Sequence, residues 1–330
     1  DMGSDSLIAG ESTRIGSRFG PDTPAIDVVE GIDLSGRNAI VTGGASGIGV
    51  FTVSALAAAG ADVTIAARNV AAASDVAAAI NAKLGQTRVD VGELELGDLA
   101  SIRSFAKRWG DRPLSILINN AGVMGCPKGR TKDGFETQFG TNHLGHFLLT
   151  RLLTPSLEAG APSRVIVLSS AAHKYGSVDF EDPNFERRDY HPFTSYGQSK
   201  TANALFAVEF DRRYKDRGIR AFSVMPGIIK TNLSRHMTEE IRSEMGFTPK
   251  DPSENDVIAP KSVEAGASTS VWAATAPELA SVGGLYLEDC AQAQPFSENL
   301  PRGKGVMPYA LDAEAAQRLW DVSDRLVGLA

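Results

Sequence analysis

The sequence predicts a single-domain α/β fold, a doubly wound parallel sheet with helices on both of its faces. Short apolar runs of strand length alternate with longer stretches of helical length through most of the 330 residues. The first apolar run, residues 38–42, ends in a glycine-rich turn that leads directly into a helix. Such alternation joins parallel strands through right-handed crossovers. The chain shows no internal repeat and no second apolar core, which predicts one domain.

The first half of the chain supplies the predicted elements in regular alternation. Each strand is a short apolar run, and each helix is a longer stretch that a glycine or a polar turn closes. In chain order these are a strand at 38–42, a helix at 50–59 that ends at Gly60, a strand at 61–66, an alanine-rich helix at 70–84, a strand at 89–96, a helix at 99–109 with Ser101 near its start, a strand at 114–119 and a long helix at 135–157.

The second half continues this alternation with two irregular insertions. In chain order these elements are a strand at 164–169, a polar, aromatic and proline-containing loop at 171–194, an amphipathic helix at 196–216, a strand at 219–225 closed by Pro226-Gly227, helix and loop at 232–259, a helix at 262–275, a strand at 284–287 and a C-terminal helix at 312–329.

The predicted domain leaves only the start of the chain outside it. Residues 1–25 are polar and are expected to form a flexible arm or to pack on a neighbour. Residues 26–330 form the domain, with substrate loops at 171–195 and 232–260 and an extension at 290–330.

Composition excludes several classes of partner. The net charge is −7, which disfavours binding to nucleic acid or to anionic membranes. No apolar run reaches the roughly 18–20 residues that span a bilayer. The start of the chain lacks the pattern of a signal peptide, and Cys126 and Cys290 have no metal-ligand spacing. These features predict a cytoplasmic protein.

A glycine-rich turn, Gly43-Gly44-Ala45-Ser46-Gly47-Ile48-Gly49, separates the first strand from its helix. Such a turn lets the backbone approach a pyrophosphate, whose charge then lies at the helix N-terminus. At the end of the second strand, Ala67 occupies the position where an acidic residue would select NAD, and Arg68 follows it. A guanidinium can pair with a 2′-phosphate, so the sequence predicts a preference for NADP(H) over NAD(H).

Tyr196 and Lys200 lie four residues apart, one turn apart on one face of the predicted helix. An ammonium beside a phenol favours the phenolate, so Lys200 is expected to lower the pKa of Tyr196 toward neutrality. A tyrosine with such a pKa can serve as a general acid and base. Ser170 follows the fifth strand and is the candidate partner for a substrate oxygen.

In these motifs the chain resembles the short-chain dehydrogenase/reductase family, with its single-domain Rossmann-type fold, over roughly residues 34–290. Ser-Ser-Ala-Ala-His at 169–173 and Ala-Ala-Arg-Asn at 66–69 are similar to the retinol-dehydrogenase-like branch. The resemblance implies hydride transfer on a CH–OH donor, with no metal. The implied catalytic residues are Asn142, Ser170, Tyr196 and Lys200. The implied cofactor-binding residues are Gly43, Ala45, Ser46, Gly47, Ile48, Gly49, Arg68, Glu95, Leu96, Asn120, Ala121, Gly122, Tyr196, Lys200, Pro226, Gly227, Ile228 and Thr231.

The resemblance also assigns roles. Tyr196 would exchange a proton with the substrate oxygen, Lys200 would bind the nicotinamide ribose, and Asn142 would hold a water that connects Lys200 to solvent. Helices 135–157 and 196–216 would form the two-fold interface of a homodimer or homotetramer. Glu95 departs from the family pattern, because an aspartate usually borders the adenine there.

The substrate is expected to be a small carbonyl or alcohol compound of apolar or aromatic character, because the two substrate loops are rich in aromatic and methionine residues. Two alternatives remain open at this point. One is a catalytically silent NADP(H)-binding sensor or scaffold, and the other is a nucleotide-sugar epimerase or dehydratase. His143 and His146 lie three residues apart on one predicted helix, but no third ligand is evident, so no metal site is predicted.

Overall fold

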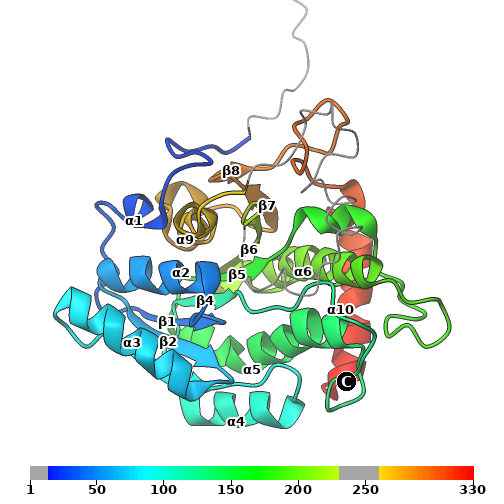
Figure 1. Cartoon of the computed structure of the whole chain (residues 1–330), viewed down its shortest axis with the longest axis horizontal. Helices are drawn as coiled ribbons and strands as arrows, with labels where there is room; N and C mark the ends of the chain where they lie inside the picture. Colours follow the sequence, from blue (N-terminus) through cyan, green and yellow to red (C-terminus); the bar gives the residue numbers. More distant parts are fainter. Residues whose placement is uncertain (1–13, 230–259) are drawn as a thin grey trace, which may run out of the picture.

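The computed structural model describes residues 14–229 and 260–330, and within them the predicted fold class is confirmed. The described strands form one sheet in the order β3-β2-β1-β4-β5-β6-β7-β8 (Figure 1). They are β1 Asn38–Thr42, β2 Asp62–Ala67, β3 Val89–Glu93, β4 Ile116–Asn119, β5 Ser163–Leu168, β6 Ile219–Met225, β7 Leu285–Glu288 and β8 Ala291–Gln292. Every pair is parallel except β7 with β8. From β1 the chain adds β2 and then β3 on one side of the sheet, and from β4 it adds the later strands on the other side. This reversal leaves a crevice at the carboxyl ends of β1 and β4.

Helices cover both faces of this sheet. One face carries α1 Ala25–Val28, α2 Gly47–Ala58, α3 Val70–Leu84 and α9 Ser268–Thr275. The other carries α4 Leu99–Trp109, α5 Gly145–Ala159, α6 Pro192–Tyr214 and α10 Ala313–Val327. Shorter described helices are η1 Phe139–Leu144, η2 Ala171–Tyr175, η3 Lys215–Arg217, α8 Val263–Gly266, η5 Pro277–Leu279 and η6 Pro308–Leu311.

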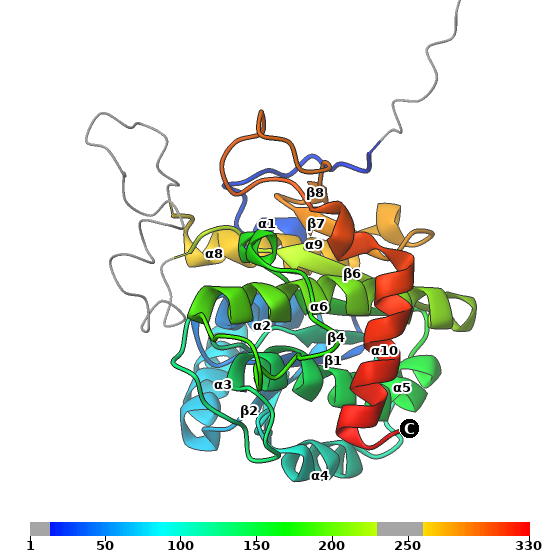
Figure 2. The same cartoon turned by 90° about the vertical axis from the view of Figure 1, so that its right-hand side faces the viewer.

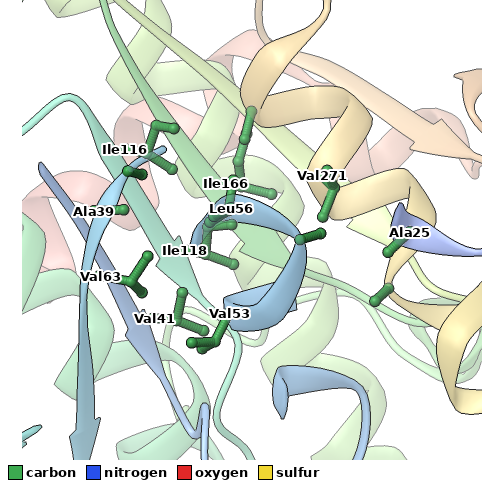
Figure 3. Packing of buried hydrophobic residues seen from close by; sticks show 14 of the residues in the cluster. Ala25, Ala39, Val41, Val53, Leu56, Val63, Ile116, Ile118, Ile166 and Val271 are labelled. Atoms are coloured by element: carbon green, nitrogen blue, oxygen red, sulfur yellow. The ribbon is translucent and has the colours of Figure 1, made fainter. Parts of the chain in front are cut away.

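Alternation along the strands builds two apolar layers. Ala39 and Val41 of β1 point into the layer under α2, and Ile40 points into the layer under α5 and α6. Figure 3 shows the first layer, where Val53 of α2 packs close to Val41 of the sheet. The sheet is therefore buried on both faces, as parallel sheets are.

Several element boundaries differ from the prediction. The predicted helix 135–157 begins as the π-helix η1 and continues as α5, and α6 begins four residues before Tyr196 because His191 caps it and Pro192 occupies its first position. The predicted strand 89–96 ends at Glu93. The predicted helix 262–275 is two helices, α8 and α9. The predictions for 232–259 and for Thr231 lie outside the described residues.

Residues 14–24, part of the predicted N-terminal arm, contact the C-terminal strand pair. The backbone N–H of Gln292 donates to the carbonyl of Ile15 at 2.7 Å, and the Ser17 hydroxyl donates to the carbonyl of Cys290 at 2.7 Å. Ile15 and Phe19 pack against the layer that holds α1 and α9.

The C-terminal helix α10 lies across α5 and α6 (Figure 2). Its Trp320 ring stacks on Phe206 with centroids 6.1 Å apart and meets Phe147 edge to face at 5.2 Å. Asp324 of α10 pairs with Arg151 of α5. The extension that follows β8 is therefore part of the domain core.

Candidate active site

The glycine-rich turn after β1 comes close to the turn that follows β4. Gly43 has a φ of +65°, and a Cβ there would lie 2.9 Å from the Cα of Ala121. A Cβ on Gly49 would lie 2.2 Å from the carbonyl oxygen of Gly43. Only glycine fits these positions. No side chain caps α2 at Ser46, so the helix begins with backbone N–H groups that no capping side chain satisfies, an arrangement that favours an anion.

A cavity of about 480 Å³ lies at the carboxyl ends of β1, β2 and β4. The structure brings fourteen of the sequence-predicted residues into its wall: Gly43, Ala45, Ser46, Gly47, Ile48, Arg68, Glu95, Leu96, Asn120, Ala121, Gly122, Tyr196, Lys200 and Pro226. The other predicted site residues that the structure describes do not line this cavity: Gly49, Asn142, Ser170, Gly227 and Ile228. The sequence analysis missed several lining residues, among them Asn69, Met124, Thr141 and Ser169.

Arg68 lies at one end of this cavity and is exposed. Ala67 precedes it at the end of β2, and Asn69 uses its side chain to cap α3 by accepting from the N–H of Ala72 at 3.0 Å. Among the described residues that line the cavity, Glu95 carries the only carboxylate. The Glu95 carboxylate accepts from the N–H of Gly97 at 3.0 Å, so it is tied to its own loop.

Thr42 directly precedes the glycine-rich turn and is a structural centre of the site, although it was not among the predicted site residues. Its hydroxyl oxygen accepts from the backbone N–H groups of Asn120 at 2.9 Å and Ala121 at 3.0 Å. It therefore donates its own proton to Nε2 of His146, 2.8 Å away, and Nδ1 of His146 donates to the carbonyl of Asn142 at 3.0 Å. This chain of bonds fixes the two turns that border the cavity, and it makes His146 a neutral structural group.

His143 is also engaged in the core, because its Nε2 lies 2.8 Å from the Ser323 hydroxyl of α10. Within residues 14–229 and 260–330, no group of three or more His, Cys, Asp or Glu side chains could hold a metal ion.

Asn142 lies in the π-helix η1, and such bulges occur often at functional sites. Its side chain binds the backbone of Val123, accepting from the N–H at 2.9 Å and donating to the carbonyl at 2.9 Å. It also donates to the Ser199 hydroxyl at 3.0 Å, which in turn donates to the carbonyl of Tyr196 at 2.7 Å. Asn142 thus connects the turn after β4 with the first turns of α6.

Tyr196 and Lys200 lie one turn apart in α6, and both are buried. The Lys200 Nζ lies 5.5 Å from the centre of the Tyr196 ring and donates to the carbonyl of Leu168 at 3.2 Å. Ser170 follows β5, and its hydroxyl caps the short helix η2 by accepting from the N–H of Ala172 at 3.1 Å. The three side chains therefore come together from α6 and from the end of β5.

The electrostatics of this pair differ from the expectation. Burial raises the pKa of Tyr196 to about 12, with the Ser170 side chain acting in the opposite direction. Burial also lowers the pKa of Lys200 to about 8, because the ammonium loses its hydration. The prediction that Lys200 lowers the pKa of Tyr196 is wrong for this structure, since desolvation dominates both groups. Tyr196 holds its proton at neutral pH.

The turn after β6 approaches the same edge. Gly227 has a φ of +102°, and a Cβ there would lie 2.5 Å from the Lys261 side chain. The carbonyl of Ile228 accepts from the N–H of Lys261 at 2.7 Å.

The residues present fit a dinucleotide. The glycine turn would clash with itself if it carried Cβ atoms, and the α2 N-terminus offers uncapped donors. The Asn120 side-chain oxygen is buried with no partner within the described residues, so it can accept from a ligand. These features suit a pyrophosphate at α2 and an adenosine near Arg68 and Glu95.

Comparisons with known proteins agree with this geometry. The family model described as short chain dehydrogenase matches residues 37–242. A protein named "Probable oxidoreductase" from Streptomyces lividans is 44% identical over 291 residues, which cover 88% of this chain and 97% of that protein. Retinol dehydrogenase 13 from Homo sapiens is 42% identical over 298 residues, which cover 90% of this chain and 86% of the human protein.

Two solved structures share the fold. An uncharacterised protein from Mycobacterium paratuberculosis is 34% identical, with a TM-score of 0.71, and the match covers 93% of this chain and 98% of that one. The complex of Pseudomonas aeruginosa RhlG with NADP is 25% identical, with a TM-score of 0.59, over 81% of this chain and 97% of that one.

Proposed function

The chain belongs to the short-chain dehydrogenase family, and on this premise we propose that it interconverts a ketone or aldehyde and an alcohol with NADP(H), using Tyr196 as general acid and base. As a member of this family it is an oxidoreductase. One observation carries the finer proposal: Tyr196 and Lys200 line the same cavity as the glycine-rich turn.

The choice of NADP(H) rests on the end of β2. Ala67 leaves no carboxylate to repel a 2′-phosphate, and Arg68 offers a guanidinium at the cavity edge. The RhlG structure, a relative with the same fold, contains NADP. These observations support NADP(H) over NAD(H).

The bound nicotinamide would supply or accept the hydride, and the chain would manage the proton. Because the pKa of Tyr196 is about 12, its hydroxyl carries a proton that it can give to a substrate oxygen during reduction. Ser170, at the end of β5, would hydrogen-bond that oxygen and stabilise its developing charge. Lys200 would orient the ribose, and Asn142 would hold the water that connects Lys200 to solvent.

The substrate class and the cellular location belong to the same proposal. Phe193 packs against Tyr196, and Met124 packs against the cluster that these two rings form with Ala172, which supports an apolar or aromatic carbonyl substrate. Retinol dehydrogenase 13 by its name acts on an apolar alcohol, which agrees with this class.

A cytoplasmic location rests on composition alone. None of the described helices combines the length and apolar character that crossing a bilayer requires.

The test is NADPH oxidation with a panel of apolar ketones and aldehydes, comparing wild type with Tyr196→Phe. We expect the variant to lose roughly 10²-fold or more in the chemical step, the scale of a lost general acid, and to retain the ability to bind NADPH. A loss below about fivefold would exclude Tyr196 as the proton donor. NADPH binding by the wild type without turnover would favour a silent sensor or scaffold protein.

A further inference from the structure

His173 lies three residues after Ser170 and is fully buried, although the reaction proposed above assigns it no role. Its Nδ1 lies 2.8 Å from the carbonyl oxygen of Ser170, and its Nε2 lies 3.0 Å from the backbone nitrogen of Met307. A carbonyl can only accept and an N–H can only donate. The ring is therefore neutral, with its proton on Nδ1 and a lone pair on Nε2.

The contacts of His173 come from three separate parts of the chain. Its carbonyl accepts from the Thr201 hydroxyl of α6 at 3.1 Å and from the Tyr309 hydroxyl of the C-terminal extension. Its ring packs against Tyr286 of β7, with centroids 5.1 Å apart. Satisfied polar groups in such a buried setting hold one geometry firmly.

The same stretch of the extension makes further bonds to this edge of the sheet. Lys304 pairs with Asp289, and the N–H of Gly305 donates to the Glu288 carboxylate at 2.9 Å. The Lys174 ammonium donates to the carbonyl of Lys304 at 2.6 Å. Residues 304–309, which we name the strap, thus bind both the turn after Ser170 and the end of β7.

We propose that His173 is a positioning residue for Ser170, and that the strap holds it in place through the N–H of Met307. This inference rests on the proposed function, in which the Ser170 hydroxyl contacts the substrate oxygen. His173 fixes the Ser170 carbonyl, and Ser170 caps η2 through its own side chain. Both ends of Ser170 are then fixed, so the hydroxyl keeps its direction relative to Tyr196.

Misplacement of such a group by a fraction of an ångström lowers the rate of the chemical step more than it changes binding. Loss of the strap contact should therefore lower kcat and leave the affinity for NADPH nearly unchanged, since the glycine turn lies elsewhere in the cavity.

Met307→Pro removes the donor and puts the proline Cδ where the N–H hydrogen lay, so the His173 ring must also move away from the strap. Met307 has a φ of −70°, which proline adopts, and the residue before it is paired in extended form with Pro295. The matched control is Met307→Leu, which changes the side chain and keeps the N–H. We expect kcat to fall roughly tenfold in Met307→Pro and less than twofold in Met307→Leu, with the NADPH Kd within twofold of wild type in both.

A second readout does not depend on turnover. In protein labelled with ¹⁵N at histidine, His173 should show a protonated Nδ1 and an unprotonated Nε2, assigned by loss of its signals in His173→Asn. The Nε2 signal should shift in Met307→Pro and stay in place in Met307→Leu. The opposite tautomer, or equal kcat in the two Met307 variants, would overturn the inference. An inactive wild type with the expected ¹⁵N pattern would instead contradict the proposed function.

Discussion

Burial governs the ionisation of the two central side chains of the site. Burial removes water from the Lys200 ammonium, which destabilises the charged form and lowers the pKa of Lys200 to about 8. Burial also destabilises the Tyr196 phenolate, so the pKa of Tyr196 rises. The i, i+4 spacing on one helix face is present, but the lysine points to the carbonyl of Leu168. The sequence spacing predicted that Tyr196 and Lys200 lie together. Whether the attraction between the ammonium and the phenolate outweighs the loss of their hydration depends on burial, which only the fold determines.

The ionisation of Lys200 predicts an alkaline limit to activity. Above about pH 8 the folded protein loses the Lys200 proton, because its pKa lies below the ordinary value of 10.5. Since the charged amine is the form that would bind the cofactor ribose, we expect kcat/KM for carbonyl reduction to fall as the pH rises through 8. The measurement is kcat/KM against pH from 6 to 10. A profile that stays flat to pH 10 would contradict this assignment.

Arg68 gives a second prediction at the scale of one residue. Its side chain is exposed at the cavity edge beside Ala67, where a 2′-phosphate would lie. Arg68→Ala should weaken NADPH by roughly tenfold, about the strength of one charged hydrogen bond, and leave NADH nearly unchanged. Fluorescence titration of both cofactors measures the ratio. Arg88→Ala, which removes an arginine paired with Asp62 outside the cavity lining, is the control and should leave the ratio alone.

Some of the roles that sequence reasoning missed depend on hydrogen bonds between residues far apart in the chain. The motif positions around Gly43 and Asn120 were predictable, because backbone geometry demands those residue types locally. Thr42 and Ser199 have ordinary side chains, and their roles arise from partners 57 to 104 residues away. Both residues stand inside sequence motifs, but a motif does not show which partner each side chain binds, and that partner appears only when the fold brings it close.

At the scale of elements, strand and helix order was predictable and helix ends were less so. The helix 70–84 and the strand 219–225 have the predicted bounds, because Gly85 and the Pro226-Gly227 turn end them locally. The π-helix η1 was not foreseen. Asn142 lies within it and binds the backbone of Val123, 19 residues earlier in the chain, a contact that helical periodicity does not reveal.

The packing of helix α10 on α5 and α6 makes a testable prediction about stability. Trp320 is 3% exposed and contacts Phe147, Phe206 and Phe210 from α5 and α6. Trp320→Ala would open a cavity in this aromatic layer, and we expect the free energy of unfolding to fall by about 3–5 kcal/mol. Urea unfolding measures the change. Gln317→Ala, an exposed position on the same helix, should alter it by less than about 0.5 kcal/mol; equal effects would refute the packing argument.

At the scale of the molecule, α10 bears on how the chain could associate. The homodimer or homotetramer expected from the sequence would pair α5 and α6 across a two-fold axis, and it stays a prediction. In the structure α10 already packs on both helices through Trp320 and the Arg151–Asp324 pair. A second copy would therefore have to use surfaces of α5 and α6 that α10 leaves uncovered, or a different face.

Three buried histidines connect the site to the stability of the whole domain. Burial lowers the pKa of His143 to about 3 and those of His146 and His173 to about 4. Each ring is neutral and hydrogen-bonded: His143 to the Ser323 hydroxyl, His146 to the Thr42 hydroxyl and His173 to the backbone N–H of Met307. In the unfolded chain each would instead take up a proton near pH 6.5.

The unfolded state therefore binds more protons than the folded state below pH 6.5, and stability falls as the pH drops from 6.5 toward 4. Above pH 6.5 this contribution is fully present. Each histidine adds up to about 1.4 kcal/mol per pH unit to the slope of the unfolding free energy. We expect His143→Gln, which cannot protonate, to reduce that slope by about one proton while leaving the active-site cavity untouched, because His143 does not line it. Urea unfolding between pH 4.5 and 8 measures the slope. An unchanged slope in the variant would show that His143 takes up no additional proton when the chain unfolds.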